Sequence, residues 1–266
     1  MGAGVKIYIA QNCKEVTARI ELSSGTRVAD ASEISNPIHG DAYEEGARLP
    51  REPWRRPATE EAQRLIATEM PRNRANTVAI VSLPDELSDD SCAVIRNVNT
   101  ETLEAELLRP LRTICEFGEP LHCIGASANR ANLKTVTINR HSGRFNGLHV
   151  DNWDGRDLDS RHLSTNRICI NIGRIERCFL FLPISLMEIA ALLANEMGPC
   201  WQPPQRYSLI GRQFMERFPD VPVVRCRLAP GEAYIAPTEN LVHDGSSIGQ
   251  SEMDEQFTMR GYIRPL

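Results

Sequence analysis

Long hydrophobic runs and blocks of like charge are both missing from this chain of 266 residues. No apolar stretch approaches the roughly 20 residues that a membrane-spanning helix needs, so the sequence predicts no membrane span. Lysine is scarce: only Lys6, Lys14 and Lys134 are lysines among the 30 basic residues, which are dispersed among 35 acidic ones. The net charge of −5 argues against nucleic acid as a partner.

Paired cysteine motifs are missing as well. The chain has 8 cysteines but no CxxC pair, and its first residues, MGAGVKIYIAQNC, lack the basic stretch and apolar core of a signal peptide. We therefore expect a cytoplasmic protein. Its cysteines should be reduced and mostly buried small hydrophobic residues, rather than zinc ligands or disulfide partners.

A single large domain is the natural expectation for a chain of this length. It divides into an irregular N-terminal segment with one helix (residues 1–75), a support strand and helix (76–132), and a β core (133–266). Helices are predicted from Thr59, as N-cap, to Met70 and from Asn99 to Phe117. Both should cover one face of the core from outside.

The core is predicted from eight short strand-like runs separated by Gly, Asn, Asp and Pro. The runs are KTVTINRH, GLHVDNW, NRICINIG, RCFLFLPI, VPVVRCRL, EAYIAPT, NLVHDG and FTMRGYI. An insert over residues 185–219, with two predicted helices, separates the fourth run from the fifth, and we expect it to act as a lid. Eight strands with this punctuation favour an α+β, mainly β fold of the jelly-roll type.

The second run carries a histidine and an aspartate two residues apart, in NGLHVDNWDG. Alternate residues of a strand point to the same side, so His149 and Asp151 should share a face. His243 lies in the seventh run, which can converge on the second in a closed roll. Two imidazoles and one carboxylate suit Fe(II) and leave positions open, so these three are the predicted metal ligands. An ordinary strand without metal remains the alternative, as does His141 or His162 in place of one ligand.

The last run, FTMRGYI, adds a cation. Thr258, Arg260 and Tyr262 alternate with apolar residues, so Arg260 should point into the core. An inward arginine without an evident acidic partner needs an anion, and a dicarboxylate would supply one through a bidentate contact. Thr258 would donate its hydroxyl to the same group. The alternative is an Arg260 paired with an interior Asp or Glu.

This order of HxD, a late histidine and an arginine resembles the Fe(II)- and 2-oxoglutarate-dependent oxygenases, over roughly residues 76–266. The resemblance implies a cupin-like double-stranded β-helix in which the three predicted ligands hold iron and Arg260 binds the far carboxylate of 2-oxoglutarate. Two features depart from the family pattern: the gap between His243 and Arg260 is long, and Tyr262 stands where a serine is usual. The retained Asp151 argues against the halogenating branch.

Polar side chains on the inner faces of other strands would be costly in a sealed core. In RICINIG the alternation places Arg167 and Asn171 inwards and the isoleucines against the covering helices; in TVTIN it places Thr137 and Asn139 inwards. We expect Asn171, Asn139 and Thr137 to help fix 2-oxoglutarate or substrate. A local hydrogen-bond network without a ligand is the alternative.

Three residues are candidates for contact with the substrate: Arg140, Trp153 and Arg167. Trp153 directly follows the HxD pair and should either wall the substrate pocket or anchor a turn. Arg140 lies just before the second run, where a solvated arginine is the alternative. The chain shows no repeat, basic groove or appended domain, which favours a free small molecule as substrate over a protein, a nucleic acid or a membrane.

The resemblance implies a dioxygenase that uses Fe(II), 2-oxoglutarate and O2, releases succinate and CO2, and hydroxylates a small molecule, such as an amino acid or a natural-product intermediate. Desaturation and ring formation are related outcomes. One rival is a cupin-like metal-dependent hydrolase or isomerase that does not use 2-oxoglutarate. The other is a jelly-roll binding module without catalysis. The oligomeric state is left open.

Overall fold

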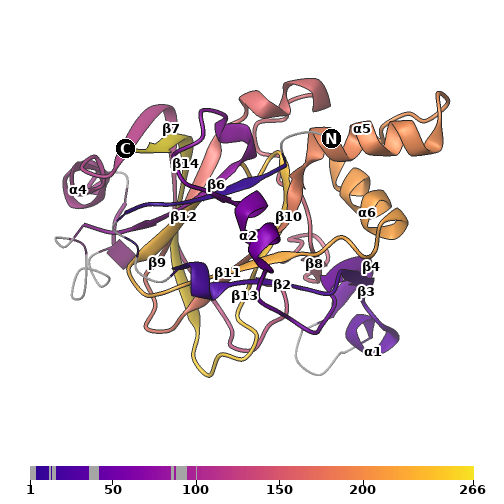
Figure 1. Cartoon of the computed structure of the whole chain (residues 1–266). Helices are drawn as coiled ribbons and strands as arrows, with labels where there is room; N and C mark the ends of the chain where they lie inside the picture. The colour runs from indigo at the N-terminus through magenta and orange to yellow at the C-terminus, as the bar shows by residue number, and fades with distance from the viewer. Residues whose placement is uncertain are drawn as a thin grey trace.

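Figure 1 shows the computed structural model of the chain, which describes residues 4–11, 13, 16–35, 42–84, 87, 95–99 and 101–266. Cys92 lies outside these residues, and four of the seven described cysteines, Cys115, Cys169, Cys178 and Cys226, are buried. No helix in the described ranges is both long and apolar enough to cross a bilayer. The fold is mixed and mainly β, with several sheets and few helices.

Two sheets face each other at the centre of the fold. The larger is built from β1 (Lys6–Ile9), β5 (Ile66–Ala67), β6 (Thr77–Ser82), β7 (Cys115–Asn129), β9 (Asn166–Asn171), β12 (Glu232–Ala236) and β14 (Asp254–Pro265). The smaller is built from β2 (Ile20–Leu22), β10 (Arg177–Ser185), β11 (Val224–Leu228) and β13 (Leu241–Ser246). The strand orders are β5-β1-β6-β12-β9-β14-β7 and β13-β10-β11-β2, so β13 is an edge strand.

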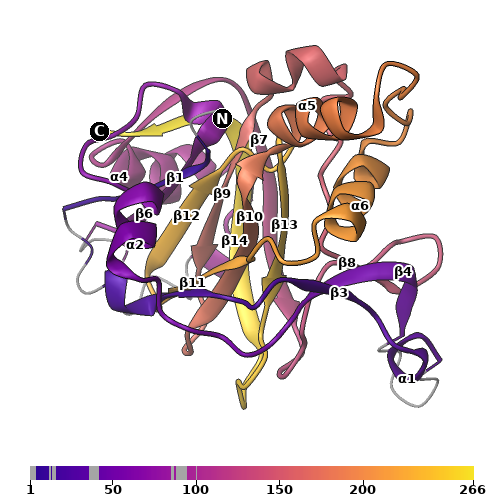
Figure 2. The same ribbon diagram turned by 45° about the vertical axis from the view of Figure 1, so that its right-hand side comes forward.

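A third, small sheet lies to one side of these two (Figure 2). It contains β3 (Thr26–Val28), β4 (Tyr43–Pro50) and β8 (Phe145–Gly147), with β4 in the middle. The short helix α1 (Ala31–Ile34) follows β3 and is capped by Asp30, which accepts hydrogen bonds from the first turn. This sheet therefore joins an N-terminal hairpin to β8, the strand just before the HxD pair.

The space between the two large sheets is filled by alternate side chains of their strands. Phe179 and Phe181 of β10 face Cys169 of β9 and Tyr234 of β12 in one buried cluster. The Phe179 and Tyr234 rings stack with their centroids 3.9 Å apart. Because alternate residues of a strand share a face, Arg177 points to the same side of β10 as these phenylalanines.

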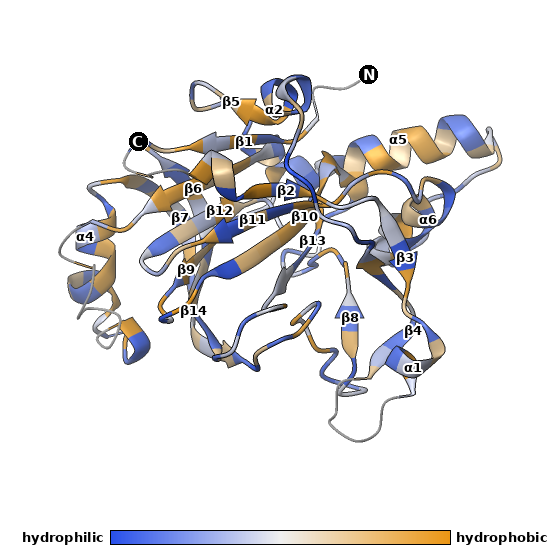
Figure 3. Ribbon diagram, turned by 60° about the horizontal axis from the view of Figure 1, so that its bottom comes forward, coloured by the Kyte–Doolittle hydropathy of each residue, from blue (hydrophilic) through white to orange (hydrophobic). Residues whose placement is uncertain are grey.

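Helices cover the outer face of each large sheet. On the larger sheet, a π-helical turn (Glu104–Leu108) and α4 (Arg109–Leu111) bury Leu107 and Leu111 against the isoleucines of β9, which confirms the predicted orientation of RICINIG. On the smaller sheet, α5 (Leu186–Met197) and α6 (Tyr207–Arg217) pack against Leu180. Apolar and polar segments alternate along α5 in Figure 3, as expected for a helix with one buried face. The two helices of the insert therefore pack on the outer face of the smaller sheet, whereas the sequence predicted that the insert would act as a lid.

Six of the eight predicted core strands form, as β9 to β14. The first run contributes only an isolated bridge between Ile138 and Phe145, and the second only the end of β8 and a bridge between His149 and His243. The backbone N–H groups of Val136 and Thr137 donate to the Asp244 side chain (3.3 and 3.2 Å) instead of to a neighbouring strand. The arrangement is compatible with a jelly roll.

Two upstream helices are shorter than predicted. The helix expected to reach Met70 is α2 (Thr59–Leu65), with Ala58 rather than Thr59 at the N-cap; Glu61 accepts a hydrogen bond from the Ala58 N–H. The helix expected over residues 99–117 ends at Leu111, and β7 follows. The Gly and Pro residues of CEFGEPLHCIGASAN are unfavourable in a strand, so the sequence does not predict β7. The strand is defined by its pairing with β14 along almost its whole length.

Candidate metal centre

His149, Asp151 and His243 come together at the edge of the smaller sheet. His243 lies on β13, and its backbone exchanges two hydrogen bonds with His149 (3.0 and 2.8 Å). The Asp151 N–H donates to the carbonyl of Thr238 at 3.1 Å. One potential ligand atom from each of the three side chains lies within 4.8 Å of the others. The predicted convergence is therefore confirmed, although the HxD pair reaches it through a single bridge and not through a regular strand.

Both histidines present the same nitrogen to the centre. Nδ1 of His149 lies 3.0 Å from the carbonyl oxygen of Gly147, and Nδ1 of His243 lies 2.9 Å from that of Leu241. A carbonyl oxygen only accepts, so each Nδ1 carries a proton, and Nε2 is the nitrogen of each ring that a metal would bind. The Nε2 atoms lie 3.7 Å from Oδ1 and Oδ2 of Asp151, respectively.

Gly147 is a position that only glycine tolerates. Its φ is +70°, and a Cβ there would lie 2.6 Å from the carbonyl oxygen of Arg48 on β4. A side chain would both strain the backbone and push β8 away from β4. The close approach keeps the Gly147 carbonyl where it accepts from His149.

Two of the donor atoms are buried without a hydrogen bond, whereas buried polar atoms normally have one. These are His243 Nε2 and Asp151 Oδ2, and the latter is in an ion pair with Arg167. The side chains of His149, Asp151 and His243 are 12%, 10% and 2% exposed, so they are shielded from bulk water. One ion shared by all three would satisfy these atoms. Two imidazoles and one carboxylate form the donor set that suits Fe(II) with open positions.

The charges around the centre favour an ionised carboxylate. Burial by itself would raise the pKa of Asp151, but Arg167, with Nη2 2.9 Å from Oδ2, and the two histidines hold it well below its usual range. Burial lowers the pKa of His243 to about 4, although Asp151 opposes this. His243 is thus neutral and able to bind a metal at any pH near neutrality.

His149 carries the proton that a metal must displace. Burial would lower its pKa, but hydrogen bonds to Asp151 and Asp244 outweigh burial and raise it to about 10. A proton therefore competes with the metal at every pH below about 10. We expect the apparent affinity for Co(II) to rise about tenfold per pH unit between roughly pH 6 and 9, since one proton leaves per ion bound. Competition titrations with a chelator at several pH values measure this slope; a flat profile would contradict it.

Asp244, which the sequence prediction missed, lies behind His149. It is fully buried, and its Oδ2 is 3.4 Å from His149 Nδ1. Its Oδ1 accepts hydrogen bonds from the N–H and the hydroxyl of Thr137, at 3.2 and 2.9 Å. Thr137, predicted to contact 2-oxoglutarate or substrate, thus supports a carboxylate that orients a metal ligand. One indication of a role for Asp244 is present in the sequence: it directly follows the predicted ligand His243 in LVHDG.

Arg260 has acidic partners, so the expectation of an unpaired inward arginine is wrong. Its Nη2 donates to Asp154 and, at 2.8 Å, to the hydroxyl of Thr165; Glu239 Oε1 lies 3.5 Å away. Its guanidinium carbon is 5.2 Å from the centroid of the half-exposed Trp153 ring. Pairing with interior acids, the alternative, is what the structure contains.

A fully buried arginine, Arg161, connects this network to the HxD segment. Its Nη1 donates to the carbonyl oxygens of Asp151 (2.8 Å) and Glu239 (2.9 Å), and its Nη2 donates to Asn152. The Glu239 carboxylate in turn accepts from the N–H of Trp153. Residues 151–153 are therefore fixed by buried charges. The polar run RDLDSRHL gives no sign that Arg161 is buried.

Asn171 and Asn139, predicted to contact 2-oxoglutarate or substrate, have local partners. Asn171 Nδ2 donates to the carbonyls of Ile175 (2.8 Å) and Leu228 (3.0 Å). Asn139 Nδ2 donates to Glu44 at 2.9 Å. These contacts are those of the local-network alternative.

The remaining candidates lie at different depths. Thr258 is buried, with its hydroxyl 3.6 Å from Cys169 Sγ. Arg140 is exposed in a turn. His141 and His162 are also exposed and lie outside the cluster, so neither replaces a predicted ligand.

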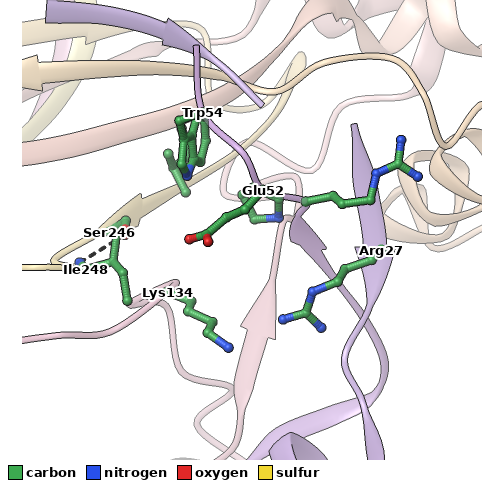
Figure 4. Close-up of a pocket in the computed structure, with 9 residues that line it drawn as sticks. Arg27, Glu52, Trp54, Lys134, Ser246 and Ile248 are labelled. Carbon is green, nitrogen blue, oxygen red and sulfur yellow. Dashed lines mark hydrogen bonds between the residues drawn. The ribbon is translucent and has the colours of Figure 1, made fainter. Parts of the chain in front are cut away.

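Two surface cavities lie apart from the cluster. One, of about 320 Å³, is lined by residues that include Arg27, Glu52, Trp54, Lys134, Ser246 and Ile248 (Figure 4). Its basic groups Arg27 and Lys134 both bind Glu33. The other, of about 640 Å³, lies beside Asp157 and Tyr207. None of the three ligand residues lines either cavity, so the donor atoms, not a hollow in the surface, identify the site.

No family model matches the chain, and no curated protein does. One solved structure to which it is similar is the crystal structure of the non-heme alpha ketoglutarate dependent epimerase SnoN from nogalamycin biosynthesis. The likeness spans 94% of this chain and 81% of that one, at 10% identity and a TM-score of 0.26. This likeness is too weak to assign a function to the chain.

Proposed function

We propose that this protein is a non-haem Fe(II)- and 2-oxoglutarate-dependent dioxygenase. It would hydroxylate, or otherwise oxidise, an unactivated C–H bond of a small molecule such as an amino acid or a natural-product intermediate. The supporting observation is the convergence of two imidazoles and one carboxylate on one point, with Nε2 of both rings on the side of the carboxylate. This donor set would hold Fe(II) and leave coordination positions for co-substrate and O2.

The residues around the centre would have distinct tasks. His149, Asp151 and His243 would hold the ion, and the carbonyl contacts to both Nδ1 atoms fix the orientation of the imidazoles. Arg167 keeps Asp151 ionised and in place. The Phe179 ring, 5.9 Å from that of His243, would help to exclude water from the site. Bound iron would supply O2 activation coupled to decarboxylation of 2-oxoglutarate to succinate and CO2.

An anaerobic titration with Fe(II) and 2-oxoglutarate tests this function. We expect a visible charge-transfer absorbance that needs both components, followed by succinate release when O2 is admitted. The His162→Ala variant, which changes an exposed histidine outside the cluster, should behave like the wild type. A metal-dependent hydrolase or isomerase would bind the metal but give neither the absorbance nor succinate. A binding module without catalysis would keep its ligand when His149 and Asp151 are both alanine.

A further inference from the structure

Arg177 is a buried cation between the two large sheets. It opens β10, is 2% exposed, and points to the same side of the strand as Phe179 and Phe181. Its guanidinium carbon lies 5.9 Å from the centroid of the Tyr234 ring. The arginine therefore faces the interior space that also borders His243, since Phe181 pairs with His243 across the sheet.

The hydrogen-bonding capacity of Arg177 is largely unused. Its Nη1 donates to Cys169 Sγ at 2.6 Å, and a thiol sulfur is a weak acceptor. Its Nε lies 3.1 Å from Asp254 Oδ1, yet neither atom makes a hydrogen bond. A guanidinium has five N–H donors, and a buried donor without an acceptor, such as Arg177 Nε, is costly. An anionic ligand would meet them.

Arg161, at the same depth, has more hydrogen-bond acceptors than Arg177, although its Nε also lacks one. It is 1% exposed, but its Nη1 donates to two carbonyl oxygens and its Nη2 to Asn152. Arg260 is likewise held by Asp154 and by the hydroxyl of Thr165. Of these three buried arginines, Arg177 makes the fewest hydrogen bonds, although it also pairs with the buried Asp254.

The position of Arg177 relative to the metal ligands suits a small dicarboxylate. Gly245 follows His243 by two residues on β13, so both face the same side. A Cβ on Gly245 would lie 2.8 Å from Val136 Cγ2 and 3.3 Å from Arg177 Nη2, so the guanidinium lies beside Gly245, about 7 Å along the strand from His243. A five-carbon chain with one end at the metal can reach this cation with the other.

We propose that Arg177, and not Arg260, binds the carboxylate of the co-substrate that is remote from the metal. This inference depends on the proposed function. Thr258, whose hydroxyl contacts Cys169 beside Arg177, adds a donor to the same carboxylate. Asp254 also accepts a hydrogen bond from Asn129 at 3.0 Å, so its charge stays partnered when the guanidinium engages a ligand.

Calorimetric titration of the Co(II)-loaded protein with 2-oxoglutarate under argon tests the assignment without relying on turnover. Arg177→Met should weaken 2-oxoglutarate binding by at least about 100-fold, because a charge-assisted bidentate contact is lost. The same variant should bind 2-oxohexanoate, which has an uncharged tail, more tightly than the wild type does. Arg260→Met should keep 2-oxoglutarate affinity within about threefold. Co(II) absorbance should be unchanged in both variants.

Arg177→Lys keeps the assignment testable if the methionine variant does not fold. A lysine cannot form the two-point contact, so we expect about tenfold weaker 2-oxoglutarate binding. Unchanged affinity in either Arg177 variant, or loss confined to Arg260→Met, would overturn the inference.

Failure of the proposed function gives a different result. If the wild type with metal binds no 2-oxoglutarate, that function is wrong, and titration of the same protein with glutarate examines the anion site alone. If the wild type binds glutarate and Arg177→Met does not, Arg177 forms an anion site. If the wild type does not bind glutarate, the proposed anion site is wrong.

Discussion

Replacement of His243 by alanine is expected to reduce the affinity for Fe(II) or Co(II) by more than about 100-fold. This exceeds the effect usual for a residue that merely supports a ligand. The reason is geometric: His243 supplies one of three donors, and no other histidine of the described ranges joins the cluster. The measurement is equilibrium dialysis against the metal, with Co(II) absorbance as a second readout.

The His162→Ala variant is the matched control for this experiment. His162 is exposed and belongs to a 3-10 helix (Leu158–Leu163), so its loss should leave the metal affinity unchanged. Asp151→Asn should also lose most of its affinity for the metal, because the neutral amide does not supply the negative charge of the carboxylate. If His243→Ala binds the metal as tightly as the wild type and is folded by circular dichroism, the assigned metal centre is wrong, and so is the proposed function.

Replacement of Glu239 by alanine is expected to lower the free energy of unfolding by about 3–5 kcal/mol, the usual cost of breaking a buried ion pair. Arg161 and Glu239 have side chains that are 0% and 1% exposed, with Nη1 and Oε2 3.3 Å apart. The alanine would leave the guanidinium uncompensated and the N–H of Trp153 without its acceptor. Urea denaturation at neutral pH measures the loss.

Glu61→Ala is the control for this second prediction. Glu61 pairs with Arg55 at 2.6 Å, but the two side chains are 30% and 52% exposed, so we expect less than about 1 kcal/mol. A double variant, Arg161→Met with Glu239→Leu, should recover part of the loss, because it removes both buried charges. Equal losses in Glu239→Ala and Glu61→Ala would mean that the buried network does not stabilise the fold.

Alternation along the chain predicted much of the interior. It placed the isoleucines of β9 under the covering helices, and it put His149 and Asp151 on one face, where His243 joins them. For the HxD pair the reasoning used a strand that is absent, yet the residues still converge, because a single bridge to His243 provides the local extended geometry. Alternation needs only a few residues of extended backbone to be informative.

The partners of buried charges were beyond such reasoning. Arg260 donates a hydrogen bond to Asp154, which precedes it by more than a hundred residues. Asp154 lies in a segment whose aspartates are typical of turns. Nothing in the local pattern distinguishes Asp154 from the exposed Asp157 and Asp159 nearby. β7 was missed for the same reason, since its pairing with β14 defines it more than its own sequence does.

The contact between Gly147 and Arg48 has a consequence for how this chain can be divided. The carbonyl that fixes His149 is held in place by β4, and β4 comes from the N-terminal part of the chain. β1, β5 and β6 extend the larger sheet from the same part, and β2 completes the smaller one. The metal ligands thus belong to an interleaved architecture. The C-terminal part that carries all three ligands is not a separable module, because early and late segments must assemble together before the centre acquires its shape.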